Sequence, residues 1–341
     1  EGKDVLVLAA GEPDFDTPLN IRKAASDAMD AGQTRYVPGK GTPALQKAIQ
    51  SKFLKDNNLN YDLDEIIVGV GGKHIIYNAM MATINPNDEV IIPAPFWVSY
   101  PDIVLLAEGK PVIVQCPENQ NFKITADQLE KSITDKTKWL MLNSPSNPTG
   151  SLYSKQELKE LAEVLLKYPQ VLIMSDDIYE KIIYDNLEFT TIASVEPKLK
   201  ERCLTLNGVS KAYCMTGWRL GYCGASKEII AAMNKIQSQS TTSTSSISMA
   251  GAVEALNGPQ EFIKDHNKAF VRRRDLVVNL LNNIDGLSCL TPEGAFYVYP
   301  SCEGVIGKET PEGKKISNDE DFMTYLLESE GIAGVHGAAF G

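Results

Sequence analysis

The sequence predicts an α/β protein with a large domain, whose mostly parallel central sheet is covered by helices on both faces, and a smaller α+β domain. Two observations predict this. From about residue 43 to 262, short runs rich in Val, Ile and Leu alternate with amphipathic stretches, as in strands that are buried on both faces between helices. Near residue 262 the alternation ends and a long helical pattern begins.

The individual elements follow from the same patterns. Candidate strands lie at 66–70, 89–93, 111–116, 138–143, 171–175, 202–207 and 219–224, with helical patterns at 73–84, 125–133 and 155–167. Beyond them we expect a helix at 262–281, a strand at 294–299 and a helix at 319–330. A strand-like run at 5–10 is expected to join this tail. The prediction is a large cofactor-binding domain at 33–262 and a small domain made of 1–32 and 263–341.

Composition excludes several classes of function. Asp and Glu number 44 against 33 Lys and Arg, a formal net charge of −11, and no basic stripe supports nucleic-acid binding. No apolar run approaches the ~18 residues that a membrane span needs. The six scattered cysteines predict reduced thiols and a cytoplasmic protein. None of the three histidines has metal-ligand spacing, so no metal site is expected.

A glycine-rich turn at 69–74 follows a strand and opens a helix, as a phosphate-binding turn should. It fails the dinucleotide fingerprint because His74 stands where the third glycine belongs, and it also fails the P-loop pattern. A nicotinamide-dependent dehydrogenase is therefore disfavoured.

Polar residues follow the ends of several predicted strands, where ligands bind in open parallel sheets. Each has a simpler explanation as a turn, a helix cap or a core side chain. Together they offer an anion-binding turn, an aromatic face, hydrogen-bond donors, a carboxylate and a lysine in an apolar segment. The residues are Gly71, Gly72, Lys73, Trp97, Asn147, Asp176, Asp177, Tyr179, Ser210, Lys211 and Arg219. This set suits pyridoxal 5′-phosphate, which binds a lysine as a Schiff base and pairs its ring nitrogen with a carboxylate.

The motifs in this set resemble those of class I aminotransferases. They are Asn-Pro-Thr-Gly at 147–150, Ser-Asp-Asp-Ile-Tyr-Glu at 175–180 and Ser-Lys-Ala-Tyr-Cys-Met-Thr-Gly-Trp-Arg-Leu-Gly at 210–221. Ala-Gly-Glu-Pro-Asp-Phe at 10–15 and Gly-Gly-Lys at 71–73 are similar to the bacterial aspartate aminotransferase subgroup that includes prephenate-active members. The resemblance implies transamination of aspartate with 2-oxoglutarate, with prephenate as a further candidate substrate.

The resemblance also implies a role for each residue. Lys211 would bind the cofactor covalently and act as the catalytic base, and Asp176 would contact the pyridine nitrogen while Asp177 has no direct role. Tyr179 and Asn147 would bond the ring's phenolic oxygen, and Trp97 would stack on the ring. The phosphate would be held by Gly72, Lys73, Ser210 and Arg219. The residues that face the substrate would be Gly11, Trp97, Asn147 and Lys73. Lys73 would pair with the distal carboxylate of an acidic substrate.

Members of this family are dimers with shared active sites, so a homodimer is expected in which Tyr36 reaches the phosphate of the other subunit. The arginine that clamps the substrate α-carboxylate in the family is expected beyond Gly341, and a further segment is expected before Glu1.

Three alternatives remain open on the sequence alone. The first is another enzyme of the same fold and cofactor: an aromatic or alanine aminotransferase, a C–S lyase or a cyclopropane-carboxylate synthase type. The second is the disfavoured dehydrogenase, and the third is an effector-binding domain of a regulator.

Overall fold

A computed structural model describes residues 4–341 of the protein, and it confirms the predicted α/β fold. A central sheet of seven strands has the order β2-β8-β7-β6-β5-β3-β4. Only β8 runs antiparallel to its neighbours. The strands are β2 (Ile66–Gly69), β3 (Glu89–Ala94), β4 (Lys110–Gln115), β5 (Thr137–Asn143), β6 (Leu172–Asp176), β7 (Cys203–Gly208) and β8 (Gly221–Gly224).

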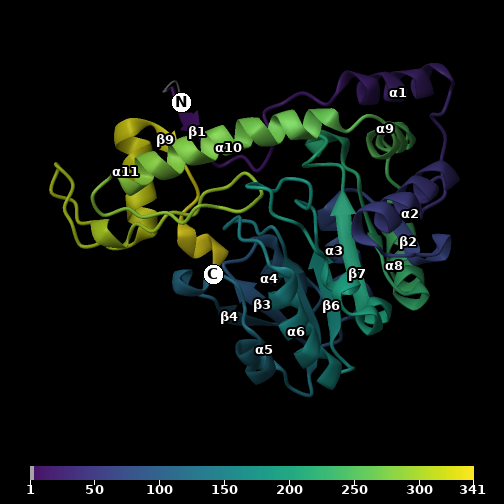
Figure 1. Ribbon diagram of the computed structural model, residues 1–341, viewed down its shortest axis with the longest axis horizontal. Coiled ribbons are helices and arrows are strands. Elements are labelled where there is room, and N and C mark those ends of the chain that lie inside the picture. Colours follow the sequence, from purple (N-terminus) through teal and green to yellow (C-terminus); the bar gives the residue numbers. More distant parts are fainter. Residues whose placement is uncertain (1–3) are drawn as a thin grey trace.

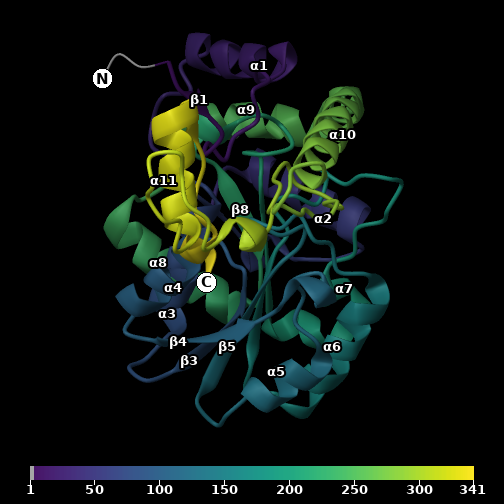
Figure 2. The same cartoon turned by 90° about the vertical axis from the view of Figure 1, so that its left-hand side faces the viewer.

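Helices cover both faces of this sheet (Figure 2). One face carries α3 (Gly72–Thr83), α4 (Ser99–Leu106) and α8 (Lys227–Ser240); the other carries α2 (Pro43–Asn57), α5 (Ala126–Ser132), α6 (Lys155–Lys167), α7 (Ile192–Val195) and α9 (Ser246–Asn257). Alternate residues of a strand enter opposite cores. In β3, Val90 and Ile92 pack on the first face and Ile91 on the second.

Local sequence explains why the elements begin where they do. Ser154 caps α6 by accepting a hydrogen bond from the Glu157 N–H at 3.2 Å, and Glu157 returns one from the Ser154 N–H at 2.7 Å. Leu158, Leu161 and Leu165 then bury one face of this helix. These signals are local, and α6 has the bounds that the sequence predicts.

Outside the sheet, α10 (Glu261–Asn282) crosses above the end of the sheet towards which the β7 arrow points (Figure 1). The chain later forms α11 (Asp319–Glu330). β1 (Leu6–Val7) pairs in parallel with β9 (Ile332–Ala333), which joins the N-terminal segment to the C-terminal one. α1 (Leu19–Asp30) packs against α9. The division into domains at residues 33 and 262 stays a prediction.

Two predicted strands differ from the structure. The run at 5–10 is a strand only at Leu6–Val7, where β9 provides a partner. The run at 294–299 is not a strand, because its backbone finds only an isolated bridge between Gly294 and Ile183. Its apolar side chains instead pack with Tyr179 and Phe270 in a small separate core.

Within residues 4–341, no helix is long and apolar enough to cross a membrane. No group of three or more His, Cys, Asp or Glu side chains in the same range could hold a metal ion.

Candidate active site

A cavity of about 460 Å³ opens at the carboxyl ends of β5, β6 and β7, beside the start of α3. It gathers all but one of the residues to which the family resemblance gives a direct role with the cofactor or the substrate. Those that line it are Gly11, Gly72, Lys73, Trp97, Asn147, Asp176, Tyr179, Ser210, Lys211 and Arg219. Tyr36 does not line the cavity, and its side chain is 95% exposed.

Lys211 lies in the turn after β7, and its amine points into the cavity. The Nζ atom donates a hydrogen bond to the backbone oxygen of Gly11 at 2.5 Å, so residues 200 positions apart meet at this point. Burial lowers the pKa of Lys211 to about 8, against the opposing charges of Asp176 and Glu12. Near pH 8 the Lys211 amine is therefore neutral in a substantial fraction of the molecules. The neutral amine is the form that can act as a nucleophile or base.

Asp176 ends β6, lines the same cavity and is buried. Its Oδ2 atom accepts a hydrogen bond from the Tyr100 hydroxyl at 2.7 Å, and its Oδ1 accepts one from the Ile178 N–H at 3.3 Å. Burial raises the pKa of Asp176 to about 6, while these hydrogen bonds and the charge of Lys211 act against the rise. A cationic partner in the cavity would therefore stabilise the ionised form of Asp176.

An anion-binding corner lies where α3 begins. Gly71 has a φ of +85°, a conformation that glycine adopts easily, and a Cβ there would lie 2.7 Å from Nη2 of Arg219. The first N–H groups of an α-helix have no partner within the helix, so Gly72 and Lys73 present donors at this corner. Ser210 lines the same cavity. The guanidinium, the hydroxyl and the helix N-terminus together fit a phosphate group.

Tyr179 and Asn147 flank the cavity from two different turns. The hydroxyls of Tyr179 and Tyr297 lie 2.6 Å apart, and burial raises the pKa of Tyr179 well above its usual value. Asn143 holds the second turn: its Oδ1 accepts from the Asn147 N–H at 2.7 Å, and its Nδ2 donates to the Asp176 backbone oxygen at 2.8 Å. This amide thus links the turn that carries Asn147 to the end of the neighbouring strand β6, where Asp176 lies.

Lys73 and Trp97 form the remaining wall. The Lys73 ammonium lies 4.8 Å from the centre of the Trp97 ring, within the range of a cation–π interaction. The Trp97 ring in turn meets the Tyr100 ring edge-on, with centroids 5.5 Å apart. This packing fixes an aromatic face and places a cation next to it.

Asp177 does not line the cavity. It is buried behind the sheet edge, where its Oδ1 accepts a hydrogen bond from the Ser175 hydroxyl at 2.6 Å. Burial raises its pKa well above the usual value. The neighbouring acids Asp176 and Asp177 therefore face different environments.

Three polar residues that organise this site, Tyr100, Asn143 and Tyr297, had no role in the sequence-based assignment, although Asn143 was among the polar residues collected at the strand ends. Tyr100 stands three positions after Trp97, so helical spacing could have placed both on one face. Asn143 is the last residue of a predicted strand, which was a usable signal. Tyr297 gave none, because it follows α10 and reaches the cavity through long-range packing.

These features define a class of protein before any comparison is made: an α/β enzyme with a half-buried lysine as the reactive group of its cavity. The sequence profile of the family described as Aminotransferase class I and II matches residues 3–341. The chain belongs to this family.

Individual relatives are similar over the whole chain. The aspartate aminotransferase of Rhizobium meliloti (strain 1021) is 56% identical over 341 residues, which are 100% of this chain and 83% of the relative. The aspartate/prephenate aminotransferase of Cereibacter sphaeroides is 57% identical over 340 residues, covering 100% of this chain and 85% of the relative.

Solved structures of aspartate aminotransferases have the same fold as this chain. The crystal structure of the aspartate aminotransferase from Rhizobium meliloti superposes with a TM-score of 0.98 at 56% identity, covering 100% of this chain and 85% of that one. The Thermus thermophilus aspartate aminotransferase with maleate gives a TM-score of 0.92 at 38% identity, covering 99% and 85%.

Proposed function

We propose that this protein transfers the amino group of aspartate to 2-oxoglutarate, giving oxaloacetate and glutamate, with pyridoxal 5′-phosphate as its cofactor. The observation that carries the proposal is the position of Lys211, whose amine of lowered pKa shares one cavity with the buried carboxylate of Asp176. The names of the relatives support aspartate as the substrate.

The donor set of the cavity fits this cofactor. The Arg219 guanidinium, the Ser210 hydroxyl and the N–H groups at the start of α3 would hold the phosphate. Asp176 would pair with the ring nitrogen, and that cation would stabilise the ionised carboxylate, which burial otherwise disfavours. Trp97 would stack on the ring.

Tyr179 and Asn147 would bond the phenolic oxygen of the ring. When bound, pyridoxal 5′-phosphate supplies a conjugated ring that accepts the electron pair left on the substrate α-carbon after loss of its proton.

The protein moves that proton through Lys211. Its neutral amine would take the proton from the substrate α-carbon as general base and, as general acid, deliver it to the cofactor's C4′ carbon rather than back to the substrate. Burial in the cavity keeps its pKa near 8, close to the working range for both roles. The bond to the Gly11 oxygen directs the amine into the cavity.

Lys73 would select acidic substrates by pairing with their distal carboxylate. Its ammonium lies beside the Trp97 face, where the side chain of a substrate would extend. Prephenate, a 2-oxo acid with a second carboxylate, is a further candidate substrate, since several relatives are named for aspartate and prephenate together.

We also propose that the protein is a cytoplasmic homodimer with shared active sites. The resemblance to a family of dimers with shared active sites carries this proposal, and the side chain of Tyr36, at 95% exposure, is free to reach a second subunit. In the dimer it would reach the phosphate of the other subunit.

An absorbance spectrum of the purified protein before and after addition of aspartate tests the function. The cofactor band should change on addition, and oxaloacetate should form in an amount matching the enzyme in a single turnover. Addition of 2-oxoglutarate should restore the band. Release of ammonia or a thiol in place of a new amino acid would identify a lyase and contradict the proposal.

A further inference from the structure

The turn that carries Tyr179 into the cavity has little regular structure of its own. Its ends are tied by the Asp177 N–H to the Leu206 oxygen at 3.0 Å and by the Ala295 N–H to the Ile182 oxygen at 2.9 Å. Between these ends only two turn bonds hold its backbone: the Glu180 N–H to the Asp177 oxygen at 2.9 Å, and the Ile182 N–H to the Tyr179 oxygen at 2.8 Å. Side chains that anchor this stretch therefore help to fix the place of Tyr179 in the site.

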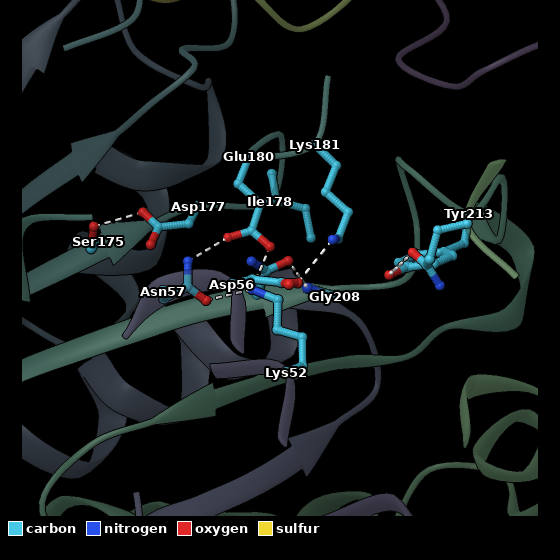
Figure 3. A network of polar contacts seen from close by, with 12 residues as sticks. Lys52, Asp56, Asn57, Ser175, Asp177, Ile178, Glu180, Lys181, Gly208 and Tyr213 are labelled. Carbon is cyan, nitrogen blue, oxygen red and sulfur yellow. Dashed lines mark hydrogen bonds and ion pairs between the residues drawn. The ribbon is translucent and has the colours of Figure 1, made fainter. Parts of the chain in front are cut away.

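Glu180, the next residue, does not line the cavity, and its side chain points towards Lys52 and Asn57 near the end of α2 (Figure 3). There it forms an ion pair with Lys52 and accepts a hydrogen bond from Nδ2 of Asn57 at 2.7 Å. Lys52 closes the ring by donating to Oδ1 of Asn57 at 2.7 Å. We call these three residues the buried triad.

The burial of the triad is nearly complete: the side chains of Lys52 and Glu180 are 3% and 5% exposed. A second link between the same segments, Lys181 to Asp56 at 2.8 Å, is 23% exposed on both sides and is accordingly weaker and more screened. The firm connection between α2 and the turn is therefore the triad.

Stability does not account for such an arrangement. The cost of taking two charges out of water is of the same size as their attraction, so apolar residues of similar volume often do as well or better. What one ion pair and two charge-assisted hydrogen bonds add is direction, because charge-assisted hydrogen bonds hold their partners in a defined geometry.

We propose that the buried triad of Lys52, Asn57 and Glu180 is a positioning device that sets the place of the Tyr179 hydroxyl in the active site. The triad holds the residue after Tyr179, and the Tyr297 hydroxyl lies 2.6 Å from the Tyr179 hydroxyl itself. This inference rests on the proposed function, since the triad acts on a residue that would bond the cofactor's phenolic oxygen.

The test replaces the triad as a whole, with the variant Lys52→Met/Asn57→Leu/Glu180→Met, so that no buried charge is left without a partner. Glu180→Gln is the conservative variant, which keeps the shape and the bond from Asn57. Lys200→Met/Glu65→Gln is the control, because it removes a partly buried ion pair next to the first residues of β2 and β7. The cavity lies at the other end of the sheet.

Three quantities are measured for each variant: the unfolding temperature, the Kd of the apoenzyme for pyridoxal 5′-phosphate, and the pH midpoint of the bound cofactor's visible absorbance. The triad variant should unfold near the wild-type temperature but bind the cofactor about tenfold more weakly, as expected for one misplaced charged hydrogen bond. Its absorbance midpoint should move to higher pH, because a bond from Tyr179 favours the ionised phenolic oxygen.

Glu180→Gln should shift both cofactor readouts in the same direction by less, and it decides the matter if the triad variant does not fold. The control should bind like the wild type. A folded triad variant, or failing that Glu180→Gln, with wild-type Kd and midpoint would overturn the inference alone. Absence of cofactor binding by the wild type would overturn the proposed function, and the inference with it.

Discussion

The Tyr100 hydroxyl opposes the rise that burial causes in the pKa of Asp176, so replacing Tyr100 with Phe should raise this pKa further. The Tyr100 hydroxyl donates to Oδ2 of Asp176 at 2.7 Å, with both side chains buried. Tyr100→Phe removes this donor and keeps the ring that packs against Trp97. The Asp176 carboxylate then keeps only the Ile178 N–H as a direct donor in the described site.

The magnitude follows from the structure. A hydrogen bond to a charged group contributes about 1.5–3 kcal/mol, and one pH unit corresponds to about 1.4 kcal/mol. Loss of the Tyr100 bond should therefore raise the pKa of Asp176 by about one to two pH units above its value of about 6 in the apoenzyme. At neutral pH most of the variant would then carry a neutral acid at this position.

The assay is the affinity of the apoenzyme for pyridoxal 5′-phosphate between pH 5.5 and 9, for the wild type and the variant. The ionisations of the cofactor are common to both, so the difference reports Asp176. Binding by Tyr100→Phe should weaken most at low pH and approach the wild type above about pH 8.

Tyr61→Phe is the matched control, since it removes a hydroxyl equally buried in the other core, bonded at 3.0 Å to the neutral Thr205. It should leave the pH profile unchanged. Identical profiles for Tyr100→Phe and the wild type would refute the reasoning, because they would mean that the hydroxyl does not stabilise the charge of Asp176.

Three more predictions follow from the site. Lys73→Ala should raise KM for aspartate at least about tenfold, as expected for the loss of one ion pair between protein and substrate, while KM for phenylalanine changes little. Equal changes in the two KM values would exclude the pairing of Lys73 with the distal carboxylate. Arg219→Gln should weaken apoenzyme binding of pyridoxal 5′-phosphate about 10- to 100-fold but not that of pyridoxal, and a parallel loss for both would remove the phosphate contact. Because burial raises the pKa of Asp176 from 3.8 to about 6, its ionisation costs the folded apoenzyme stability as pH rises through this range. Asp176→Asn should thus be more stable than the wild-type apoenzyme by up to about 3 kcal/mol at pH 8, with no gain near pH 4; equal free energies of unfolding at pH 8 would contradict this.

The sheet and its covering helices could be predicted because their signals are local. The Ser154 cap and the leucines of α6 predict that helix to the residue. The predicted strand at 294–299 failed because a strand needs a partner, and the apolar residues there serve a small aromatic core instead. An alternating pattern of apolar side chains is compatible both with a strand and with a segment that packs into a small core.

The site shows the same division. Lys211, Asp176 and Asn147 could be predicted because each follows a strand, and the carboxyl ends of parallel strands meet. Tyr297 and the contact between Lys52 and Glu180 could not be, because they join segments more than 100 residues apart by packing that no local pattern records.

The most direct test of the account is borohydride reduction of the purified protein, followed by proteolysis and mass spectrometry. We predict that the peptide containing Lys211 carries the mass of a reduced pyridoxal 5′-phosphate group, and that Lys211→Ala carries none and has lost nearly all turnover. A wild-type peptide without this added mass, or full turnover by the variant, would contradict the central claim.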